Sequence, residues 1–170
     1  GEASGPLIQL FQGINNKNAK ILIPGCGNAY EAEYLFNAGY KNVVIIDIAQ
    51  EPLDDFKSRN PEFPSKQIVL GDFFKHQGIY DIIVEQTFFC AINPNMRPAY
   101  VEKCHELLNN TGSVIGVLFN REFDGGPPFG GSTEEYQSLF KFKFSKVSFE
   151  RSPHSIKPRK NSEVVFCCEK

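Results

Sequence analysis

Two glycines and an acidic residue have the types and the spacing of a binding site. Gly25 and Gly27 follow the apolar run at residues 21–23, and Asp47 ends a second apolar run at residues 43–46. Glycine has no Cβ, so the backbone can turn sharply and a ligand can lie against it. A carboxylate at the end of the second strand can accept hydrogen bonds from both hydroxyls of a ribose. The order strand, glycine turn, helix, strand, acid therefore predicts a nucleotide-binding α/β unit.

The glycine pair alone does not distinguish an adenosine ligand from a structural turn, but the acid at this distance favours adenosine. A helix over residues 30–38 would aim its free N–H groups at the ligand. Tyr30 occupies the place of the third glycine in the dinucleotide fingerprint. No Walker lysine follows the turn, which argues against a P-loop.

Two further stretches follow expected strands at the same edge of the sheet. Asp72 beside Phe73 can accept a hydrogen bond from an adenine amine and cover the ring, although a turn with a core phenylalanine is the alternative. Glu85 and Gln86 follow the fourth strand, next to the reacting end of a ligand, although Glu85 could also be a solvated strand end. Four of the next six residues, 87–92, are apolar, which is unusual for a surface loop.

Composition restricts the classes of protein and of site. The chain has 170 residues and a net charge of −2, so it lacks the excess of positive charge that is typical of nucleic-acid-binding proteins. No apolar run reaches the length of a membrane span. Five cysteines without paired metal spacing, and three scattered histidines, predict reduced thiols in a cytoplasmic protein, no metal site and no catalytic thiol. We expect a monomer, because no surface stripe requires a partner.

The remaining pattern predicts the fold. Strands are expected at 19–24, 42–48, 66–70, 80–84, 113–119, 142–150 and 163–168, and helices at 6–13, 30–38, 51–59, 96–109 and 132–140. The glycine-rich stretch 124–131 is expected to be a loop that lines the site. The last two strands have no helix between them and must be antiparallel. The prediction is a Rossmann-like α/β fold with helices on both faces of a seven-stranded, mostly parallel sheet.

These features carry a resemblance to a known family. The chain resembles the class I S-adenosylmethionine-dependent methyltransferases, more narrowly the thiopurine S-methyltransferase superfamily, and most closely its thiol and halide methyltransferase branch. The resemblance rests on Ile23-Pro24-Gly25-Cys26-Gly27, Asp47-Ile48, Gly71-Asp72-Phe73-Phe74, Gln86-Thr87-Phe88-Phe89-Cys90-Ala91-Ile92, Met96-Arg97-Pro98 and Gly126-Pro127-Pro128-Phe129.

The resemblance implies a cofactor, S-adenosylmethionine, and a role for each matching residue. The residues that it places at the cofactor are Gly25, Cys26 and Gly27 at the methionine part, Asp47 and Ile48 at the ribose, Asp72 and Phe73 at the adenine, and Glu85 and Gln86 near the sulfonium. The residues that it places around the methyl acceptor are Phe88, Phe89, Cys90, Arg97 and Phe129. Arg97 could attract an anionic acceptor or be solvated on a helix surface. The basic residues Lys157, Arg159 and Lys160 could reach the mouth of the pocket or lie on a solvated hairpin.

The expected reaction is in-line attack of a soft nucleophile, a thiol, hydrosulfide, halide or thiopurine, on the sulfonium methyl. A nucleophile that arrives deprotonated needs no base, so no catalytic residue is expected. Relatives carry a tryptophan-bearing segment that closes over the cofactor. This chain has no tryptophan, and we expect residues 1–170 to be a single methyltransferase domain that lacks this lid. A cofactor-binding module without turnover and an NAD-dependent oxidoreductase are the alternatives.

Overall fold

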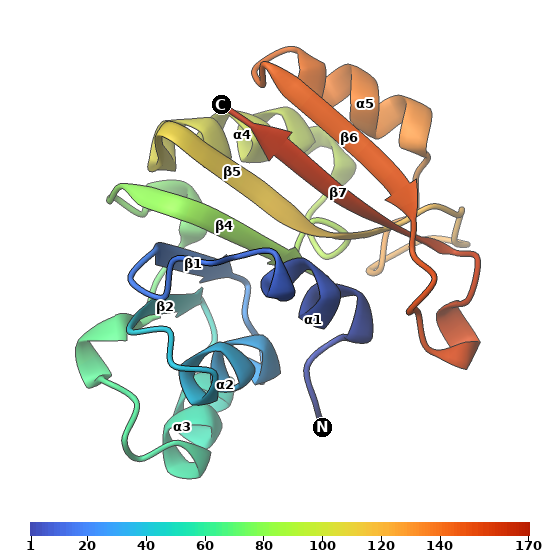
Figure 1. Ribbon diagram of the computed structural model, residues 1–170. Helices are drawn as coiled ribbons and strands as arrows, with labels where there is room; N and C mark the ends of the chain where they lie inside the picture. Colours follow the sequence, from blue (N-terminus) through green and yellow to red (C-terminus); the bar gives the residue numbers. More distant parts are fainter.

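A seven-stranded sheet with the order β3-β2-β1-β4-β5-β7-β6 forms the centre of the computed structural model, which describes residues 1–170 (Figure 1). The strands are β1 (Lys20–Pro24), β2 (Asn42–Asp47), β3 (Ile68–Leu70), β4 (Tyr80–Gln86), β5 (Leu108–Phe119), β6 (Lys146–Arg151) and β7 (Glu163–Glu169). The α-helices are α1 (Gly5–Gln12), α2 (Tyr30–Asn37), α3 (Gln50–Arg59), α4 (Arg97–Leu107) and α5 (Thr133–Lys141). Four 3-10 turns complete the chain: η1 (Ser65–Gln67), η2 (Phe73–Lys75), η3 (Pro94–Met96) and η4 (Lys157–Arg159).

The strand directions confirm the predicted fold class. Strands β1 to β5 are parallel to one another, and β7 runs antiparallel to both β5 and β6. The chain moves outward from β1 through β2 to β3 and then returns to place β4 on the other side of β1. The order therefore reverses between β1 and β4. In open α/β sheets a ligand crevice forms at such a point, outside the carboxyl ends of the strands.

The sheet separates two apolar cores, because successive side chains of a strand point to opposite faces. In β1, Ile21 and Ile23 join the core beneath α1, α2 and α3, whereas Leu22 joins the core beneath α4 and α5. Figure 1 shows α1 to α3 on one face of the sheet and α4 with α5 on the other. All these strand residues are buried, so the sheet is covered on both faces, as parallel sheets require.

Four strand boundaries differ from those expected by more than one residue. Strand β4 continues through Glu85 and Gln86, because β5 offers Gly116 and Val117 as partners. Strand β5 begins at Leu108, directly after α4. The 3-10 turn η1 replaces the expected start of β3. Strand β6 starts only at Lys146, since the chain from Phe142 to Ser145 is still turning away from α5.

Candidate active site

The glycine turn and Asp47 are joined at the switch point. Gly25 and Gly27 have φ angles of +56° and +49°, a left-handed conformation that side chains rarely adopt. The Gly27 N–H donates to Asp47 Oδ2 at 2.9 Å, and the Ala49 N–H donates to Asp47 Oδ1 at 3.0 Å. Each carboxylate oxygen has a further lone pair that can accept a ligand hydroxyl. The carboxylate is therefore held in place before any ligand binds.

A crevice of about 720 Å³ opens beside Asp47, within the usual size range of ligand pockets. The residues that line it are Gly25, Ile46, Asp47, Ile48, Leu70, Gly71, Asp72, Phe73, Phe74, Thr87, Phe88, Ala91, Ile92 and Met96. It thus collects residues from the carboxyl ends of β1 and β2 and from the segments after β3 and β4. Asp72 Oδ1 accepts from the Phe74 N–H at 2.9 Å, which fixes this carboxylate at the start of η2. We call this hollow the adenosine crevice, because apolar walls with two placed carboxylates suit a nucleoside.

A second crevice, of about 710 Å³, lies on the other side of the glycine turn and shares Gly25 and Thr87 with the first. Its lining includes the amino-terminal residues, the turn at residues 25–31, Gln86, Arg159 and Glu163. The Phe88 ring lies against Gly25 where the two hollows meet. A Cβ at Gly25 would stand 2.2 Å from Phe88 Cδ2, so only glycine fits there. We call this second hollow the methionine crevice.

Glu85 does not face either crevice. Its side chain is fully buried, Oε1 accepts from the Phe88 and Phe89 N–H groups at 2.8 and 2.9 Å, and Oε2 accepts from the Tyr100 hydroxyl at 2.6 Å. Burial raises the pKa of this carboxyl to about 7, against the lowering effect of the three hydrogen bonds. Burial contradicts the alternative of a solvated strand end, while the expected position beside the cofactor stays a prediction. Glu85 anchors the segment that carries Phe88.

Arg97 is also buried. The side chain is only 4% exposed and lines neither crevice. Nη1 lies 2.7 Å from Glu135 Oε1, Nη2 donates to the Gly130 carbonyl at 2.7 Å, and the guanidinium carbon lies 4.8 Å from the centre of the Phe89 ring. Arg97 is therefore not solvated on a helix surface, and its contact with an acceptor stays a prediction. It ties the loop before α5 to the segment after β4.

The other residues expected around the acceptor, Phe89, Cys90 and Phe129, line neither crevice. Phe89 and Cys90 are buried, and the Phe129 N–H donates to the Cys90 carbonyl at 2.7 Å, so the Gly-Pro-Pro-Phe loop supports the segment after β4. Of the five expected acceptor residues, the structure brings Phe88 alone to a crevice wall. Thr87 lines both crevices and was missed. Its φ of +60° could not be anticipated for a β-branched residue.

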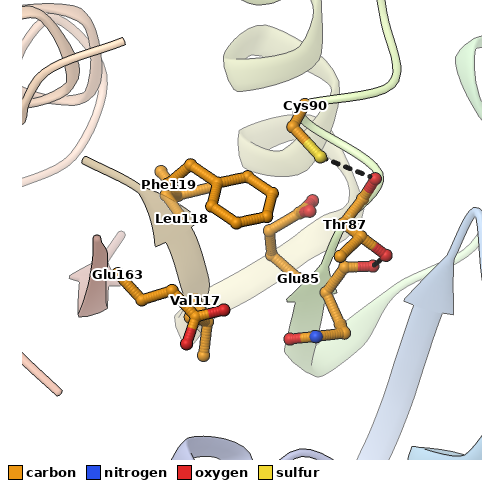
Figure 2. A pocket seen from close by; sticks show the side chains of 8 residues that line it. Glu85, Thr87, Cys90, Val117, Leu118, Phe119 and Glu163 are labelled. Carbon is orange, nitrogen blue, oxygen red and sulfur yellow. Dashed lines mark hydrogen bonds between the residues drawn. The ribbon is translucent and has the colours of Figure 1, made fainter. Parts of the chain in front are cut away.

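A small cavity of about 10 Å³, room for one water-sized atom, lies where β4, β5 and β7 meet (Figure 2). Glu85, Thr87, Cys90 and Glu163 contribute side chains to its wall, and Gln86 Oε1 is buried nearby without a hydrogen-bond partner. Burial raises the pKa of Cys90 to about 11 and that of Cys26 to about 12. Both thiols therefore stay protonated near neutral pH and are poor nucleophiles.

A third hollow, of about 570 Å³, lies between α4 and α5, away from the switch point. The structure has no group of three or more His, Cys, Asp or Glu side chains that could hold a metal ion. None of the helices has the length and apolar composition that crossing a bilayer requires. The fold and the pair of crevices at the switch point match the Rossmann-like methyltransferase fold that the sequence predicted.

Comparisons with known proteins specify the family. The sequence profile described as "Thiopurine S-methyltransferase (TPMT)" matches residues 1–170. Thiocyanate methyltransferase 1 of Brassica oleracea is 30% identical over 97% of this chain and 76% of its own length. The probable thiol methyltransferase 2 of Arabidopsis thaliana is 29% identical over the same shares. A solved structure of the 1,6-didemethyltoxoflavin-N1-methyltransferase of Burkholderia thailandensis, with bound S-adenosylhomocysteine, has a TM-score of 0.76, 17% identity, and coverage of 98% of this chain and 76% of that one.

The chain belongs to the thiopurine S-methyltransferase family. It is accordingly an S-adenosylmethionine-dependent methyltransferase that acts on small nucleophiles. The NAD-dependent oxidoreductase that the glycine turn alone left open is excluded by this membership.

Proposed function

We propose that the chain transfers the methyl group of S-adenosylmethionine to a small soft nucleophile: a thiol, hydrosulfide or halide, with thiopurines as larger acceptors. The observation that carries the proposal is the pair of crevices that meet at Gly25 and Thr87, one suited to a nucleoside and the other open to a second ligand. The names of the thiocyanate and thiol methyltransferase relatives support the choice of a soft acceptor.

The residues present fit the cofactor. Asp47 would accept the ribose hydroxyls, and Asp72 with Phe73 would hold the adenine in the adenosine crevice. The open left-handed turn at Gly25, Cys26 and Gly27, together with Gln86, would border the methionine part. A Cβ built at Gly27 meets nothing within 4 Å, so a ligand can approach this backbone closely.

The chain's own contribution to the reaction is alignment and the exclusion of water. When bound, S-adenosylmethionine supplies an electrophilic methyl group on a positively charged sulfur. Phe88, whose ring lies against Gly25 where the two crevices meet, would help to remove the solvent shell of an anionic nucleophile. Neither cysteine at the site ionises near neutral pH, and Glu85 faces the core. We therefore assign no general base and propose an acceptor that arrives as an anion or as a neutral soft atom.

We further propose the setting in which the chain works. Residues 1–170 would act as one methyltransferase domain, monomeric and cytoplasmic, on a small molecule and not on nucleic acid. The net charge of −2 and the free thiols support this setting.

Methyl transfer from labelled S-adenosylmethionine to hydrosulfide, an aryl thiol, iodide and a thiopurine tests the proposal. We expect turnover on the first three acceptors. Cofactor binding without transfer to any acceptor would overturn the proposal in favour of a binding module without turnover. Isothermal titration with S-adenosylmethionine and with NAD completes the test, because tighter NAD binding would contradict the cofactor assignment.

A further inference from the structure

Arg159 occupies a defined place on the wall of the methionine crevice. It ends η4, and its Nη1 lies 3.2 Å from Glu163 Oε1, while its guanidinium carbon lies 5.3 Å from the centre of the Phe119 ring. The Glu163 side chain is 4% exposed and that of Arg159 is 37% exposed. The ion pair holds one end of the guanidinium, and its remaining N–H groups stay available to a ligand in the crevice.

The strand order puts this guanidinium on one particular side of the crevice. Phe119 ends β5, Glu163 begins β7, and the sheet runs β3-β2-β1-β4-β5-β7. Neighbouring strands lie about 4.8 Å apart, so β5 stands roughly 10 Å beyond β1 and its glycine turn. The cofactor, as placed above, extends over the ends of β3, β2, β1 and β4. Arg159 therefore lies on the side from which the acceptor must approach.

The charged side chains of the methionine crevice indicate the charge of the methyl acceptor that would bind beside the cofactor. The charged side chains that line it are Glu2, Glu31, Arg159 and Glu163. Glu31, whose Oε1 accepts from the Ser4 N–H at 3.0 Å, and Glu2 are carboxylates that suit the sulfonium and ammonium of the cofactor. A guanidinium would repel those two groups. As the one cationic side chain of this wall, Arg159 suits a negatively charged group instead, which is either the acceptor or the carboxylate of the methionine part.

We propose that Arg159 selects anionic methyl acceptors, and that Glu163 limits this attraction by neutralising part of the charge. This inference rests on the proposed function. The acceptor class is a small soft anion, such as thiocyanate, hydrosulfide or iodide, that approaches between Arg159 and the segment at Gln86 and Thr87. Arg159 binds and orients the acceptor and takes no proton.

The test compares KM for iodide and for thiocyanate, whose charges do not change with pH. For Arg159→Met we expect KM to rise about tenfold, because a charge-assisted contact is lost, while the Kd of S-adenosylmethionine stays within twofold. For Glu163→Gln we expect KM to fall severalfold. Lys157→Met is the matched control: it removes the same charge from an exposed neighbour that lines neither crevice, and KM should not change. Thermal melting of each variant checks that it is folded.

Two results would overturn the inference. One is an unchanged KM in a folded Arg159→Met variant. The other is a weaker Kd for S-adenosylmethionine with unchanged KM, which would assign the guanidinium to the cofactor carboxylate. If the unsubstituted chain transfers no methyl group to any anion, the proposed function fails by itself. Calorimetric titration of thiocyanate into the S-adenosylhomocysteine complex, with and without Arg159→Met, then decides the anion site, and equal affinities would refute it.

Discussion

Asp47, Asp72 and Glu85 have similar carboxyl groups, yet their surroundings give them different tasks. Asp47 and Asp72 border the adenosine crevice, and each accepts backbone N–H groups while keeping lone pairs for a ligand. Glu85 is fully buried, and all its contacts are internal. Burial without a cation disfavours the charged form, whereas exposure leaves the charge available for recognition. The first two therefore suit ligand binding and the third suits loop anchoring.

Replacing Asp47 by asparagine should weaken cofactor binding without unfolding the turn. The amide keeps one oxygen for a backbone N–H but loses the charge that would hold the ribose hydroxyls. Hydrogen bonds to charged groups contribute about 1.5–3 kcal/mol, so the Kd of S-adenosylmethionine should rise roughly tenfold to a hundredfold by calorimetry. Asp55→Asn, on the exposed side of α3, is the control and should bind like the unsubstituted protein. An unchanged Kd in Asp47→Asn would remove Asp47 from the cofactor site.

Glu85 should make stability depend on pH. Burial raises its pKa from the ordinary 4.5 to about 7 in the folded protein, so between these values the folded chain holds a proton that the unfolded chain has released. Stability contributed by this group is therefore present below about pH 4.5 and is lost as the pH rises to 7. The Glu85→Gln variant carries an uncharged side chain at this position at every pH, so this loss does not occur in the variant. From pH 5 to pH 8, the unfolding free energy of the unsubstituted protein should therefore fall relative to that of Glu85→Gln by up to about 3 kcal/mol.

Denaturant unfolding at several pH values measures this difference. Glu51→Gln, at an exposed position in the first turn of α3, should show the pH dependence of the unsubstituted protein. If the Glu85→Gln curve ran parallel to that of the unsubstituted protein, the carboxyl would not titrate in this window.

At the scale of elements, the segment after β4 is held from both sides. Glu85 binds the Phe88 and Phe89 N–H groups from the strand, and the loop before α5 supports the segment through the Phe129 to Cys90 hydrogen bond. Arg97, at the start of α4, connects this loop to Phe89 through the Gly130 carbonyl and Glu135. The wall of the crevice is thus positioned by Glu85, Arg97 and Phe129, which line neither crevice.

Arg97→Met should loosen this arrangement while leaving the cofactor site intact. Losing the bond to Gly130 and the ion pair with Glu135 should cost about 1–3 kcal/mol of unfolding free energy. Amide exchange over residues 126–131 should accelerate, acceptor KM should rise, and the Kd of S-adenosylmethionine should stay constant. Arg121→Met is the matched control, because Arg121 precedes the same loop but is exposed. Unaltered exchange of the loop in Arg97→Met would show that other contacts hold it.

The sequence predicted these elements to different degrees, for reasons visible in the structure. The glycine turn, Asp47 and Asp72 each directly follow a short strand. The local sequence pattern was therefore enough to predict that they lie at the same edge of the sheet. The predicted end of β4 came too early because Glu85 and Gln86 resemble the polar residues of a loop, while their pairing partners in β5 lie 31 residues away. Arg97 and Arg159 also depended on distant partners, Glu135 and Phe119, which no local pattern reveals.

At the scale of the whole molecule, the alternation of apolar side chains along the strands produces the two cores, one on each face of the sheet. In β1 and β2 the side chains alternate between the two cores, and the final antiparallel pair followed from its short connection. Both features are local in sequence, which is why the whole fold could be predicted. The crevices are different, because each is assembled from segments that meet only after folding.

This assembly predicts how the whole chain responds to S-adenosylhomocysteine. A ligand at a hundred times its Kd should stabilise the fold by about 2.7 kcal/mol, which raises the melting temperature by a few degrees. Amide exchange should slow together in three separate segments, 25–31, 71–74 and 86–92, since one ligand would span both crevices. Strand β6, at the far edge of the sheet, should slow only as far as global stability requires and serves as the internal control. Protection confined to 71–74 would mean that the nucleoside alone is bound, and that the two crevices do not form one site.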